Sequence, residues 1–469
     1  MERILTQETL KQEGKQVVLK GWVHSRRDMG KVVFLDIRDR SGIMQVVCVP
    51  GELDAASQEA LPAIRDEWVI AVTGEVKRRG GKQINKNLPT GTIEVLAKKI
   101  EVMNACQALP FEISKDTGAI NEETRLKYRY LDLRTERAQR NLRLRSSFVE
   151  GCRRYLFDND FVEIETPLLS KATPEGSRDF VVPSRLKPGK FFALPQSPQQ
   201  YKQLLMVAGF ERYFQIARCL RDEDLRADRG FEHTQVDIEM SFVEREDLLN
   251  MIEAMMIAVV EQLGFTIKQK PFPRMTYQEA LATYGVDKFD MRTDQEKNDP
   301  AVLAYAWVID FPFFEKTDEG GWTFTHNPFS MPKPEHLDWL MKGEHIPDIL
   351  TSQYDLVCNG YEIGGGSIRA HKPEILRATF RVLGYSDKEI DEQFGHMITA
   401  FNYGAPPHGG IAHGVERLVM ILANEIYLRE VQAFPQTSSG HTSVMDAPSD
   451  LRKDQLEELG IQIRPAKKK

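Results

Sequence analysis

Short runs of alternating hydrophobic and polar residues dominate the first hundred residues of the chain. Five such runs are rich in valine and isoleucine, and glycine-containing turns separate them: KQVVLKGWVHSRR, KVVFLDIRDRSG, IMQVVCVP, WVIAVTGEVKRR and GTIEVLAKKIEVMN. This pattern is typical of β-strands joined by tight turns. A stretch with helical character, GELDAASQEALPAIRDE, separates the third run from the fourth. We therefore predict a small closed barrel of five strands over residues 1–105.

A five-stranded barrel of this kind is expected to be of the OB type. Such barrels bind single-stranded nucleic acid on one strand face, with aromatic rings that stack on bases and basic loops that contact phosphate. Phe34 lies among basic residues and suits stacking, although a core position in the barrel fits it equally well. The neighbouring basic residues are Arg26, Arg27, Lys31 and Arg38. The segment KRRGGKQINK contains no acid, which also fits a solvated loop.

The remainder of the chain mixes helices and strands. Residues 106–140 are expected to form a linker or hinge, and residues 461–469 a disordered basic tail. A long amphipathic helix begins near ERAQRNLRLR and leads into FVEIETPLLS, where Pro167 predicts an edge strand. Because no regular βαβ rhythm follows, we expect residues 141–460 to form an antiparallel sheet flanked by helices, which makes the fold class α+β.

Composition and charge exclude several classes of protein. The chain has 469 residues, a net charge of −7 and five widely separated cysteines without a CxxC pair. This cysteine usage argues against a zinc ribbon or a disulfide framework and favours the reducing cytoplasm. The most apolar run, MIEAMMIAVVEQLG, is too short to span a bilayer, and the first residues lack the apolar core of a signal peptide. We expect neither a membrane nor DNA among the partners.

The segment RCLRDEDLRADRGFEHTQVDIEMSF concentrates charged residues at a predicted hairpin. With residues 214–223 as a strand, period two places Arg221 and Glu223 on one face. The return strand places a polar set on one face and an apolar set on the other. The polar set is Gln235, Asp237, Glu239 and Ser241. A solvent-facing sheet has the same alternation, so this pattern alone does not define a site.

These residues resemble motif 2 of the class II aminoacyl-tRNA synthetases, specifically the bacterial aspartyl-tRNA synthetases. FVEIETPLLSKATPEGSRDF resembles motif 1 with the loop that follows it, and GGIAHGVERLVMIL resembles motif 3. The segments ALPQSPQQYKQLLM, WVIDFPFFE and YEIGGGSIRAH match the same family. The resemblance covers about residues 16 to 440. Six motifs in the expected order are far more specific than any one of them.

The resemblance implies an aspartate–tRNA ligase. Such enzymes join aspartate and ATP to form aspartyl-adenylate, and then transfer aspartate to the 3'-terminal adenosine of tRNA(Asp). Some members also charge tRNA(Asn), whose product an amidotransferase then converts. The family also implies a homodimer with Pro167 at the interface, and Mg²⁺ as the cofactor.

The resemblance assigns two arginines to catalysis: Arg221 holds the α-phosphate, and Arg417, at the start of the motif 3 helix, meets the γ-phosphate. Arginine suits this role because its planar fork grips phosphate and stays charged. The implied ATP-binding residues are Arg221, Glu223, Phe231, His233, Gln235, Glu362 and Arg417. Glu362 is the implied Mg²⁺ ligand, with Asp355 as a second. These two have opposite parity on a regular strand, and a bulge at Gly360 would reconcile them.

For aspartate, the resemblance implies cations around the side-chain carboxylate and acceptors around the ammonium group. Arg369 and Lys202 pair with the carboxylate, which makes the site intolerant of a neutral analogue. The full implied set is Glu175, Ser197, Gln199, Lys202, Asp237, His326 and Arg369. A structural hydrogen bond explains Ser197 equally well.

By the same resemblance, the barrel binds the anticodon of the tRNA. Phe34 stacks on a base, Gln45 reads a base edge, and the loop with Arg78 and Arg79 meets the backbone. The segment RRDMGK around Met29 is where the choice between tRNA(Asp) and tRNA(Asn) is expected. The implied tRNA-binding residues are Arg26, Arg27, Met29, Phe34, Gln45, Arg78 and Arg79.

Three features depart from the family pattern. Only a bare connector, TDQEKNDPAVLAYA, stands where bacterial members usually carry a large insertion domain. His233 replaces the usual stacking phenylalanine, which predicts weaker and pH-dependent stacking. Asn327 replaces the second histidine of the usual His-His-Pro-Phe loop.

Two kinds of alternative stay open. An asparaginyl- or lysyl-tRNA synthetase shares the barrel and the class motifs. A non-catalytic RNA-binding paralogue predicts the loss of key residues, whereas all four that we tested for are present: Arg221, Glu223, Glu362 and Arg417.

Overall fold

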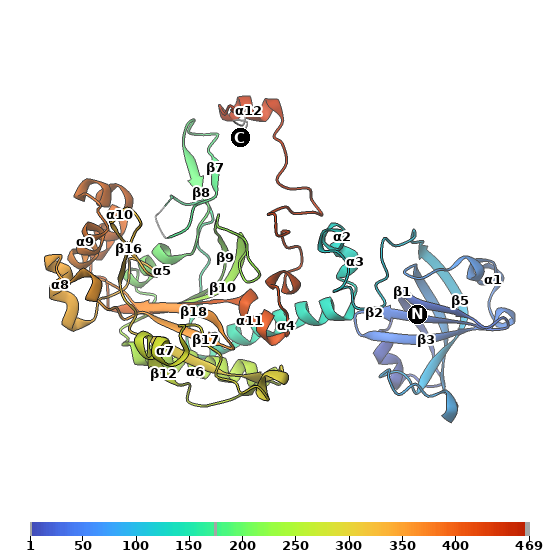
Figure 1. Cartoon of the computed structure of the whole chain (residues 1–469). Helices are drawn as coiled ribbons and strands as arrows, with labels where there is room; N and C mark the ends of the chain where they lie inside the picture. Colours follow the sequence, from blue (N-terminus) through green and yellow to red (C-terminus); the bar gives the residue numbers. More distant parts are fainter. Residues whose placement is uncertain (1, 173–175, 465–469) are drawn as a thin grey trace. The chain divides into compact units, whose positions relative to one another are not determined.

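The chain forms two compact units, Met1–Lys115 and Asp116–Lys469, in a computed structural model that describes residues 2–172 and 176–464 (Figure 1). Each unit has its own hydrophobic core. Within the described residues, no helix combines the length and the apolarity needed to cross a bilayer.

The first unit is a closed five-stranded barrel with the strand order β1-β2-β3-β5-β4, which confirms the OB-type prediction. Its strands are β1 (Gln16–Asp28), β2 (Val33–Asp39), β3 (Gly42–Cys48), β4 (Val69–Arg78) and β5 (Ile93–Asn104), with helix α1 (Ala55–Ala60) between β3 and β4. The long strand β1 pairs with both β2 and β4. Gly21 permits this, because a Cβ atom there would lie 2.3 Å from the backbone oxygen of Arg38.

The second unit begins with two short helices, α2 (Glu122–Lys127) and α3 (Arg129–Asp132). Arg125 is buried, and its Nη2 lies 2.7 Å from Oε1 of Glu430, a residue from the C-terminal part of this unit's sequence. Part of the stretch expected to be a linker is therefore packed into this unit. The predicted long amphipathic helix follows as α4 (Glu136–Asp158).

An eight-stranded sheet forms the centre of the second unit, in the order β12-β14-β17-β18-β19-β10-β9-β6. Its strands are β6 (Val162–Glu163), β9 (Arg212–Leu220), β10 (Glu232–Ser241), β12 (Arg274–Thr276), β14 (Tyr305–Ile309), β17 (Tyr354–Cys358), β18 (Tyr361–Ile368) and β19 (His408–Gly414). Neighbours are antiparallel except at the two edges, where β12 and β6 run parallel to their partners. The antiparallel sheet and the edge strand before Pro167 are as predicted.

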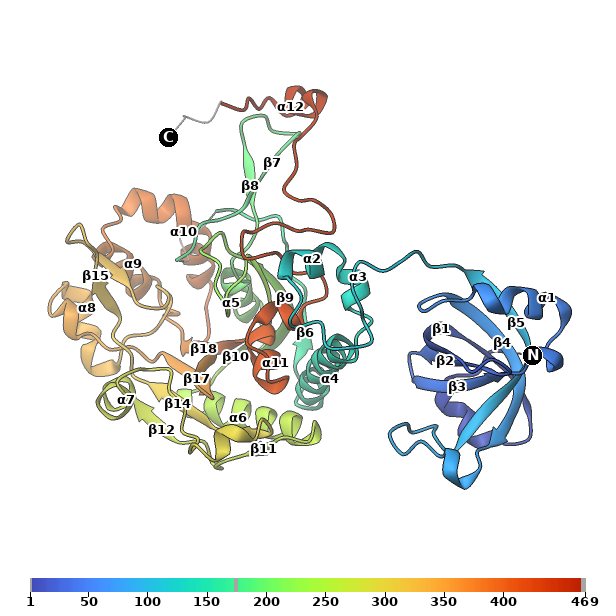
Figure 2. The same ribbon diagram turned by 45° about the vertical axis from the view of Figure 1, so that its right-hand side comes forward.

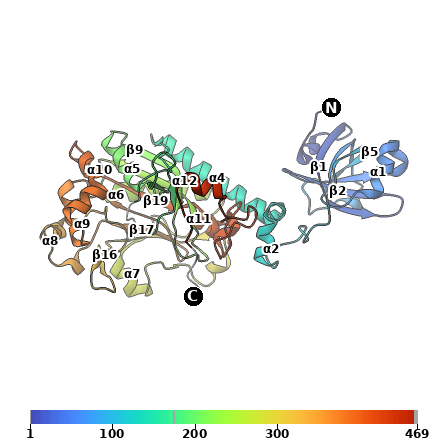
Figure 3. The same cartoon turned by 90° about the horizontal axis from the view of Figure 1, so that it is seen from above.

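Helices cover the apolar face of this sheet. The core joins α4, α6 (Arg245–Gln262) and α11 (Val415–Leu422) to the sheet through residues such as Phe148, Ile252, Ile238 and Leu418 (Figure 2). Three further helices, α8 (Leu337–Lys342), α9 (Pro373–Val382) and α10 (Asp387–Phe401), pack together at one end of the unit (Figure 3). The opposite, polar face of the central strands remains open to helix α5 (Gln199–Val207) and to the candidate site.

Further helices and strands of the second unit lie outside the central sheet. They are α7 (Tyr277–Tyr284), α12 (Lys453–Leu459) and three two-stranded sheets: β7 (Val181–Pro183) with β8 (Phe191–Ala193), β11 (Thr266–Ile267) with β13 (Val302–Leu303), and β15 (Phe314–Lys316) with β16 (Trp322–Phe324).

Candidate active site

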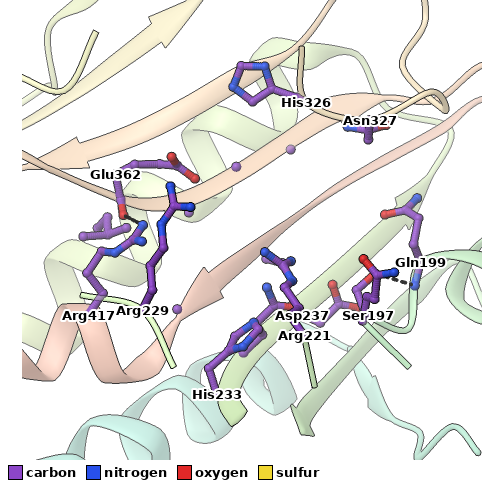
Figure 4. A pocket seen from close by; sticks show the side chains of 18 of the residues that line it. Ser197, Gln199, Arg221, Arg229, His233, Asp237, His326, Asn327, Glu362 and Arg417 are labelled. Atoms are coloured by element: carbon purple, nitrogen blue, oxygen red, sulfur yellow. Dashed lines mark hydrogen bonds between the residues drawn. The ribbon is translucent and has the colours of Figure 1, made fainter. Parts of the chain in front are cut away.

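A cavity of about 350 Å³ lies on the polar face of β10, β18 and β19 (Figure 4). Helix α5, the loop between β9 and β10, and the start of α11 complete its wall. It brings together residues from distant parts of the sequence that the analysis above selected. These are Ser197, Gln199, Lys202, Arg221, Glu223, His233, Gln235, Asp237, His326, Glu362, Arg369 and Arg417.

Two of the selected residues that the structure describes, Phe231 and Asp355, are not part of this lining. Glu175 lies outside the described residues. Phe231 packs edge-on against Phe180 at a centroid distance of 5.4 Å, away from the cavity lining. Asp355 is 1% exposed and lies behind the lining residues, where His326 and Gln353 bind it.

The hairpin of β9 and β10, whose loop carries Arg221 and Arg229, differs in one detail from its prediction. Strand β9 ends at Leu220 rather than at residue 223. The Arg221 N–H still donates to Phe231 O at 2.8 Å, whereas the Asp222 N–H, which points to the other side of the chain, donates to Arg178 O at 3.1 Å. The Arg221 side chain lines the cavity, and its buried Nε has no hydrogen-bond partner in the described part of the chain. This unpaired donor is available to a ligand.

Four buried charged residues form the floor of the site. Lys202 Nζ donates to Asp237 Oδ1 at 2.6 Å and lies 3.2 Å from Glu239 Oε2. Arg369 donates to the two Glu239 oxygens, from Nε at 2.9 Å and from Nη2 at 3.1 Å. Each side chain is at most 2% exposed. Buried charges are tolerated only when they are paired, and here two cations balance two anions.

The two carboxylates of the floor have different environments. Burial raises the pKa of Asp237, although Lys202 opposes this. Burial also disfavours the charged form of Glu239, but Arg369 and Lys202 outweigh it and hold the pKa of Glu239 at about 2. Asp237 Oδ2 has no hydrogen-bond partner in residues 2–172 and 176–464. A ligand cation such as an ammonium group would satisfy this oxygen.

Helix α5 begins at the rim of the site. The Gln199 N–H donates to Ser197 Oγ at 3.3 Å, and Gln199 Nε2 donates to Gln203 Oε1 at 3.0 Å. Ser197 therefore has a structural contact at the helix start, and both side chains also line the cavity (Figure 4).

A second group of charges occupies the end of the cavity near α11. Arg417 Nη1 donates to the backbone oxygen of Glu362 at 2.5 Å, and Arg417 Nη2 lies 3.1 Å from Asp228 Oδ2. Glu362 Oε2 lies 2.8 Å from Lys288 Nζ. Arg417 lies in the first turn of α11, as predicted, and its buried Nε has no partner within the described residues.

A bulge in β18 sets the positions of Glu362 and Asp355. Leu356 pairs with Gly364, but the next residue, Val357, pairs with Glu362, so Ile363 is the extra residue. The expectation of a bulge at Gly360 is therefore wrong in its place. Gly360 (φ 90°) and Asn359 (φ 50°) instead form the tight turn between β17 and β18, where left-handed backbone is needed.

Electrostatic interactions among Glu362, Asp355 and His326 shift the pKa values of these groups. Burial raises the pKa of Asp355, and the Glu362 charge adds to this. Burial also disfavours the charged Glu362, but Lys288 and Arg417 outweigh it and hold its pKa at about 2. For His326, burial opposes the charge, yet Asp355, with Oδ2 3.1 Å from Nε2, raises the pKa.

The donors at this end fit a magnesium ion that is bound together with phosphate. Glu362 supplies carboxylate oxygens at the cavity wall, whereas both oxygens of the buried Asp355 are bound by His326 and Gln353. No cluster of three or more acidic, histidine or cysteine side chains that could hold a metal occurs among the residues described. Magnesium typically takes one or two carboxylates and fills its shell with water and substrate phosphates.

His233 and Asn327, the two substitutions in the expected pattern, both line the cavity. Burial, with Arg221 and Arg417 nearby, lowers the pKa of His233 to about 3. Its ring is therefore neutral at physiological pH, which contradicts the prediction that its stacking depends on pH. Asn327 Oδ1 accepts from the Phe329 N–H at 3.0 Å, and its Nδ2 donates to Gln353 Oε1 at 3.3 Å, so it shapes the loop.

One face of the barrel joins an aromatic ring to a polar network. Arg27 lies over the Phe34 ring at 5.6 Å, and its Nη2 donates to Gln45 Oε1 at 3.0 Å. Gln45 in turn donates to Glu94 Oε2 at 3.0 Å. Phe34 is only partly buried and belongs to this face rather than to the barrel core.

The remaining barrel residues are placed differently from one another. Met29 is exposed, and the Arg78 side chain is 75% exposed. Arg26 pairs with Asp28 at 2.9 Å. Arg79 was expected in a surface loop but is buried, and its Nε donates to Ile93 O at 2.9 Å.

Comparison with known families covers both units. The model of class II tRNA synthetases (D, K and N) matches residues 121–438, and the model of OB-fold nucleic acid binding domains matches residues 17–103. The chain belongs to the class II tRNA synthetases. The resemblance seen in its motifs is thereby confirmed.

Curated relatives match this synthetase over nearly its whole length. A protein of Rubrobacter xylanophilus named aspartate–tRNA(Asp/Asn) ligase is 40% identical, with 96% of this chain and 95% of the relative covered. A protein of Geobacillus kaustophilus named aspartate–tRNA ligase is 39% identical, with 96% of each covered. The first alignment extends over 578 positions, more than the 469 residues of this chain, so that relative carries residues absent here.

Solved structures share the fold of this synthetase. Asparaginyl-tRNA synthetase of Pyrococcus horikoshii, complexed with asparaginyl-adenylate, has a TM-score of 0.75 at 24% identity, with 93% of this chain and 98% of that chain covered. Aspartyl-tRNA synthetase of Entamoeba histolytica has a TM-score of 0.73 at 22% identity, with 93% and 91% covered.

Several residues of the synthetase site were not anticipated from its sequence. Glu239 was assigned to the polar face of its strand, but not as the partner of Arg369. Arg229 and Asp228 lie in the loop between β9 and β10, where a sequence gives no direction for side chains. The other unanticipated lining residues include Gln196, Gln353 and Glu416. Lys288 comes from the segment after α7.

Proposed function

We propose that this synthetase is an aspartate–tRNA ligase. The observation that carries the proposal is the floor of the cavity. There, Lys202 and Arg369 offer positive charge for a side-chain carboxylate, while the unpaired Asp237 Oδ2 offers an acceptor for an ammonium group. Asp237 and Glu239 already balance these two cations, so the preference rests on their remaining N–H donors, which form stronger, charge-assisted hydrogen bonds with a carboxylate than with an amide. This argues for aspartate over asparagine, and a lysine side chain would meet like charge.

ATP is the second substrate in this class, and the arginines of the cavity suit its phosphates. We assign Arg221 to the α-phosphate and Arg417 to the terminal phosphate, with His233 beside the adenine and Glu223 and Gln235 near it. The carboxylate of aspartate attacks the α-phosphorus, and the bond to diphosphate breaks. The chain's part is to position the reactants and to neutralise developing charge. Glu362, with Asp355 behind it, would hold Mg²⁺, which neutralises phosphate charge when bound.

The second step transfers aspartate from the adenylate to the 3'-terminal adenosine of tRNA, with AMP as the leaving group. We propose tRNA(Asp) as the acceptor, and the barrel face around Phe34, Arg27 and Gln45 as the anticodon site. Stacking on an exposed ring and hydrogen bonds to base edges are how single-stranded RNA is read. The proposed place of action is the cytoplasm, with translation.

A second acceptor, tRNA(Asn), is favoured by the names of some relatives, since the Rubrobacter protein is named for both tRNAs and the Geobacillus protein for one. An enzyme that charges both requires an amidotransferase to convert the product on tRNA(Asn). The substrate choice is tested by diphosphate exchange with aspartate, asparagine and lysine in turn. Exchange that depends on aspartate alone supports the proposal, and exchange with asparagine or lysine instead contradicts it.

We further propose a homodimer built on the edge of the second unit. Exposed apolar side chains gather in sequence around β6 and Pro167: Phe157, Val162, Leu168 and Leu169, each more than 40% exposed. Such a set is typical of a two-fold interface. Light scattering at micromolar concentration should report twice the 53.7 kDa mass of the chain, whereas a particle of 53.7 kDa would refute the dimer.

A further inference from the structure

The segment after helix α7 holds a lysine beside the start of β18. Phe289 is buried, and its ring stacks on Tyr284, the last residue of α7, at a centroid distance of 4.2 Å. The Gly360 N–H, in the turn between β17 and β18, donates to Phe289 O at 3.1 Å. Because both contacts fix Phe289, its neighbour Lys288 is held next to Glu362, two residues beyond that turn.

Lys288 contacts the Glu362 carboxylate directly. Nζ lies 2.8 Å from Oε2, whereas Arg417 reaches only the backbone oxygen of Glu362. Asp290, two residues after Lys288, is already bound to Arg292 at 2.8 Å, so it does not draw the ammonium away. The ammonium group thus occupies a carboxylate oxygen at the end of the cavity where a cation is expected.

The contact is open enough to exchange. The Lys288 side chain is 41% exposed and that of Glu362 is 26% exposed. Ion pairs with this much solvent contribute little to folding, because water and salt screen them. A lysine stem is flexible and its ammonium group is easily rehydrated. The pair can therefore open when a stronger cation arrives, without loss of the fold.

We propose that Lys288 is a positioning residue that competes with the divalent cation for Glu362. In the unloaded enzyme, its ammonium group holds the carboxylate in place through the contact at 2.8 Å. It also weakens the binding of a free divalent ion, since both cations need the same carboxylate and repel each other. The metal would then enter with ATP, whose phosphates supply the missing negative charge. The inference rests on the proposed function, in which Glu362 is a metal residue.

The test measures Mn²⁺ binding to the nucleotide-free enzyme by electron paramagnetic resonance. Lys288→Met removes the charge but keeps most of the stem, so Mn²⁺ should bind roughly three-fold or more tightly than to the unaltered enzyme. Lys288→Arg should stay within about two-fold, because it keeps the charge. Lys297→Met is the matched control, since Lys297 pairs with Asp294 instead, and it should also stay within about two-fold.

A further substitution tests whether the gain depends on the Glu362 carboxylate. Adding Glu362→Gln to Lys288→Met should abolish the tighter binding. Equal or weaker Mn²⁺ binding by Lys288→Met, with an unchanged melting temperature, would overturn the inference. A gain that survives Glu362→Gln would also overturn it.

Aspartate-dependent diphosphate exchange separates this inference from the proposed function. In an active enzyme, the Mg²⁺ concentration for half-maximal exchange should fall in Lys288→Met. If the unaltered enzyme exchanges but Lys288→Met shows no change in Mn²⁺ affinity, only the inference fails. If the unaltered enzyme shows no exchange with aspartate, the proposed function fails, and this inference falls with it.

Discussion

Asp237 and Glu239 lie two residues apart on one strand, and the two carboxylates have different roles in the buried floor of the site. Both oxygens of Glu239 are bound by Arg369, at 2.9 and 3.1 Å. Asp237 binds Lys202 through Oδ1 alone, and its Oδ2 is left without a partner in the described chain. Glu239 is thus committed to the protein, whereas Asp237 retains capacity for a ligand.

Two isosteric substitutions should therefore affect different properties, one mainly aspartate binding and the other mainly the stability of the fold. Asp237→Asn should weaken aspartate binding roughly 10- to 100-fold, because a charge-assisted hydrogen bond to the ammonium group is lost. It should change the free energy of unfolding by less than about 1 kcal/mol, because Lys202 still has the Glu239 carboxylate as its counter-charge. Glu239→Gln should lower that free energy by about 3 kcal/mol, since Arg369 and Lys202 lose a buried counter-charge. Aspartate titration and urea unfolding of both variants check this, and equal effects on both quantities would contradict it.

The raised pKa of His326 predicts that aspartate binding weakens with rising pH. The Asp355 carboxylate favours the charged imidazole and raises the pKa of His326 above its usual value near 6.5, so the cation persists above that pH and is lost as the pH rises further. A substrate with net negative charge then meets one cation fewer. The KM for aspartate should therefore rise as the pH is raised above about 6.5. His326→Gln should have a higher KM at the low end and a flatter profile, and an unchanged slope would count against the assignment.

His233 should produce no pH dependence in ATP binding. Its pKa of about 3 leaves the ring neutral throughout the working range. His233→Phe should lower the KM for ATP a few-fold, roughly, because a larger aromatic face stacks more strongly. The ratio of the two KM values should be the same at pH 6 and pH 8. A ratio that changes with pH would show that the imidazole titrates in the working range.

His413 predicts a stability effect that is separate from the site. It pairs with Val236 across the sheet, on the face that the helices cover, and both ring nitrogens are buried without a partner in the described chain. Burial lowers its pKa to about 3. Because the unfolded chain takes up a proton below about pH 6.5 and the folded chain does not, stability falls as pH falls from there toward 3.

His413→Phe should remove both the cost of the two unpaired buried nitrogens and the loss of stability at low pH. We expect it to raise the free energy of unfolding by about 1 kcal/mol at pH 7.5. The gain should grow by a further 1 kcal/mol, roughly, at pH 5.5, where the protonation of unfolded His413 no longer contributes. Urea unfolding at the two pH values measures this. A gain that stays constant or shrinks at the lower pH would contradict the account.

The sequence predicted those features that depend on local patterns. The strand runs of the barrel, the alternation along β10 and the position of Arg417 at the start of α11 all follow from periodicity or motif. Such patterns fix which face of an element a residue occupies. The α+β class and the antiparallel centre of the sheet followed in the same way.

Contacts between distant segments did not follow from the sequence. Nothing in the run before Phe289 indicates that Lys288 meets Glu362, because that contact depends on how α7 packs against the turn at Gly360. The burial of Arg79 goes with its contacts to Ile93 and Glu94 on the neighbouring strand. The bulge at Ile363 depends on pairing with β17. Each is a tertiary outcome that a single-sequence pattern does not encode.

The measurement that tests the central claim most directly is the charging of two purified transcripts, tRNA(Asp) and tRNA(Asn), with labelled aspartate and ATP. The account predicts that tRNA(Asp) is charged, and that Arg221→Ala and Arg417→Ala remove this activity. Charging of tRNA(Asn) as well would add the second acceptor and require an amidotransferase. Charging of neither transcript by the unaltered enzyme, with no aspartate-dependent diphosphate exchange, would contradict the account.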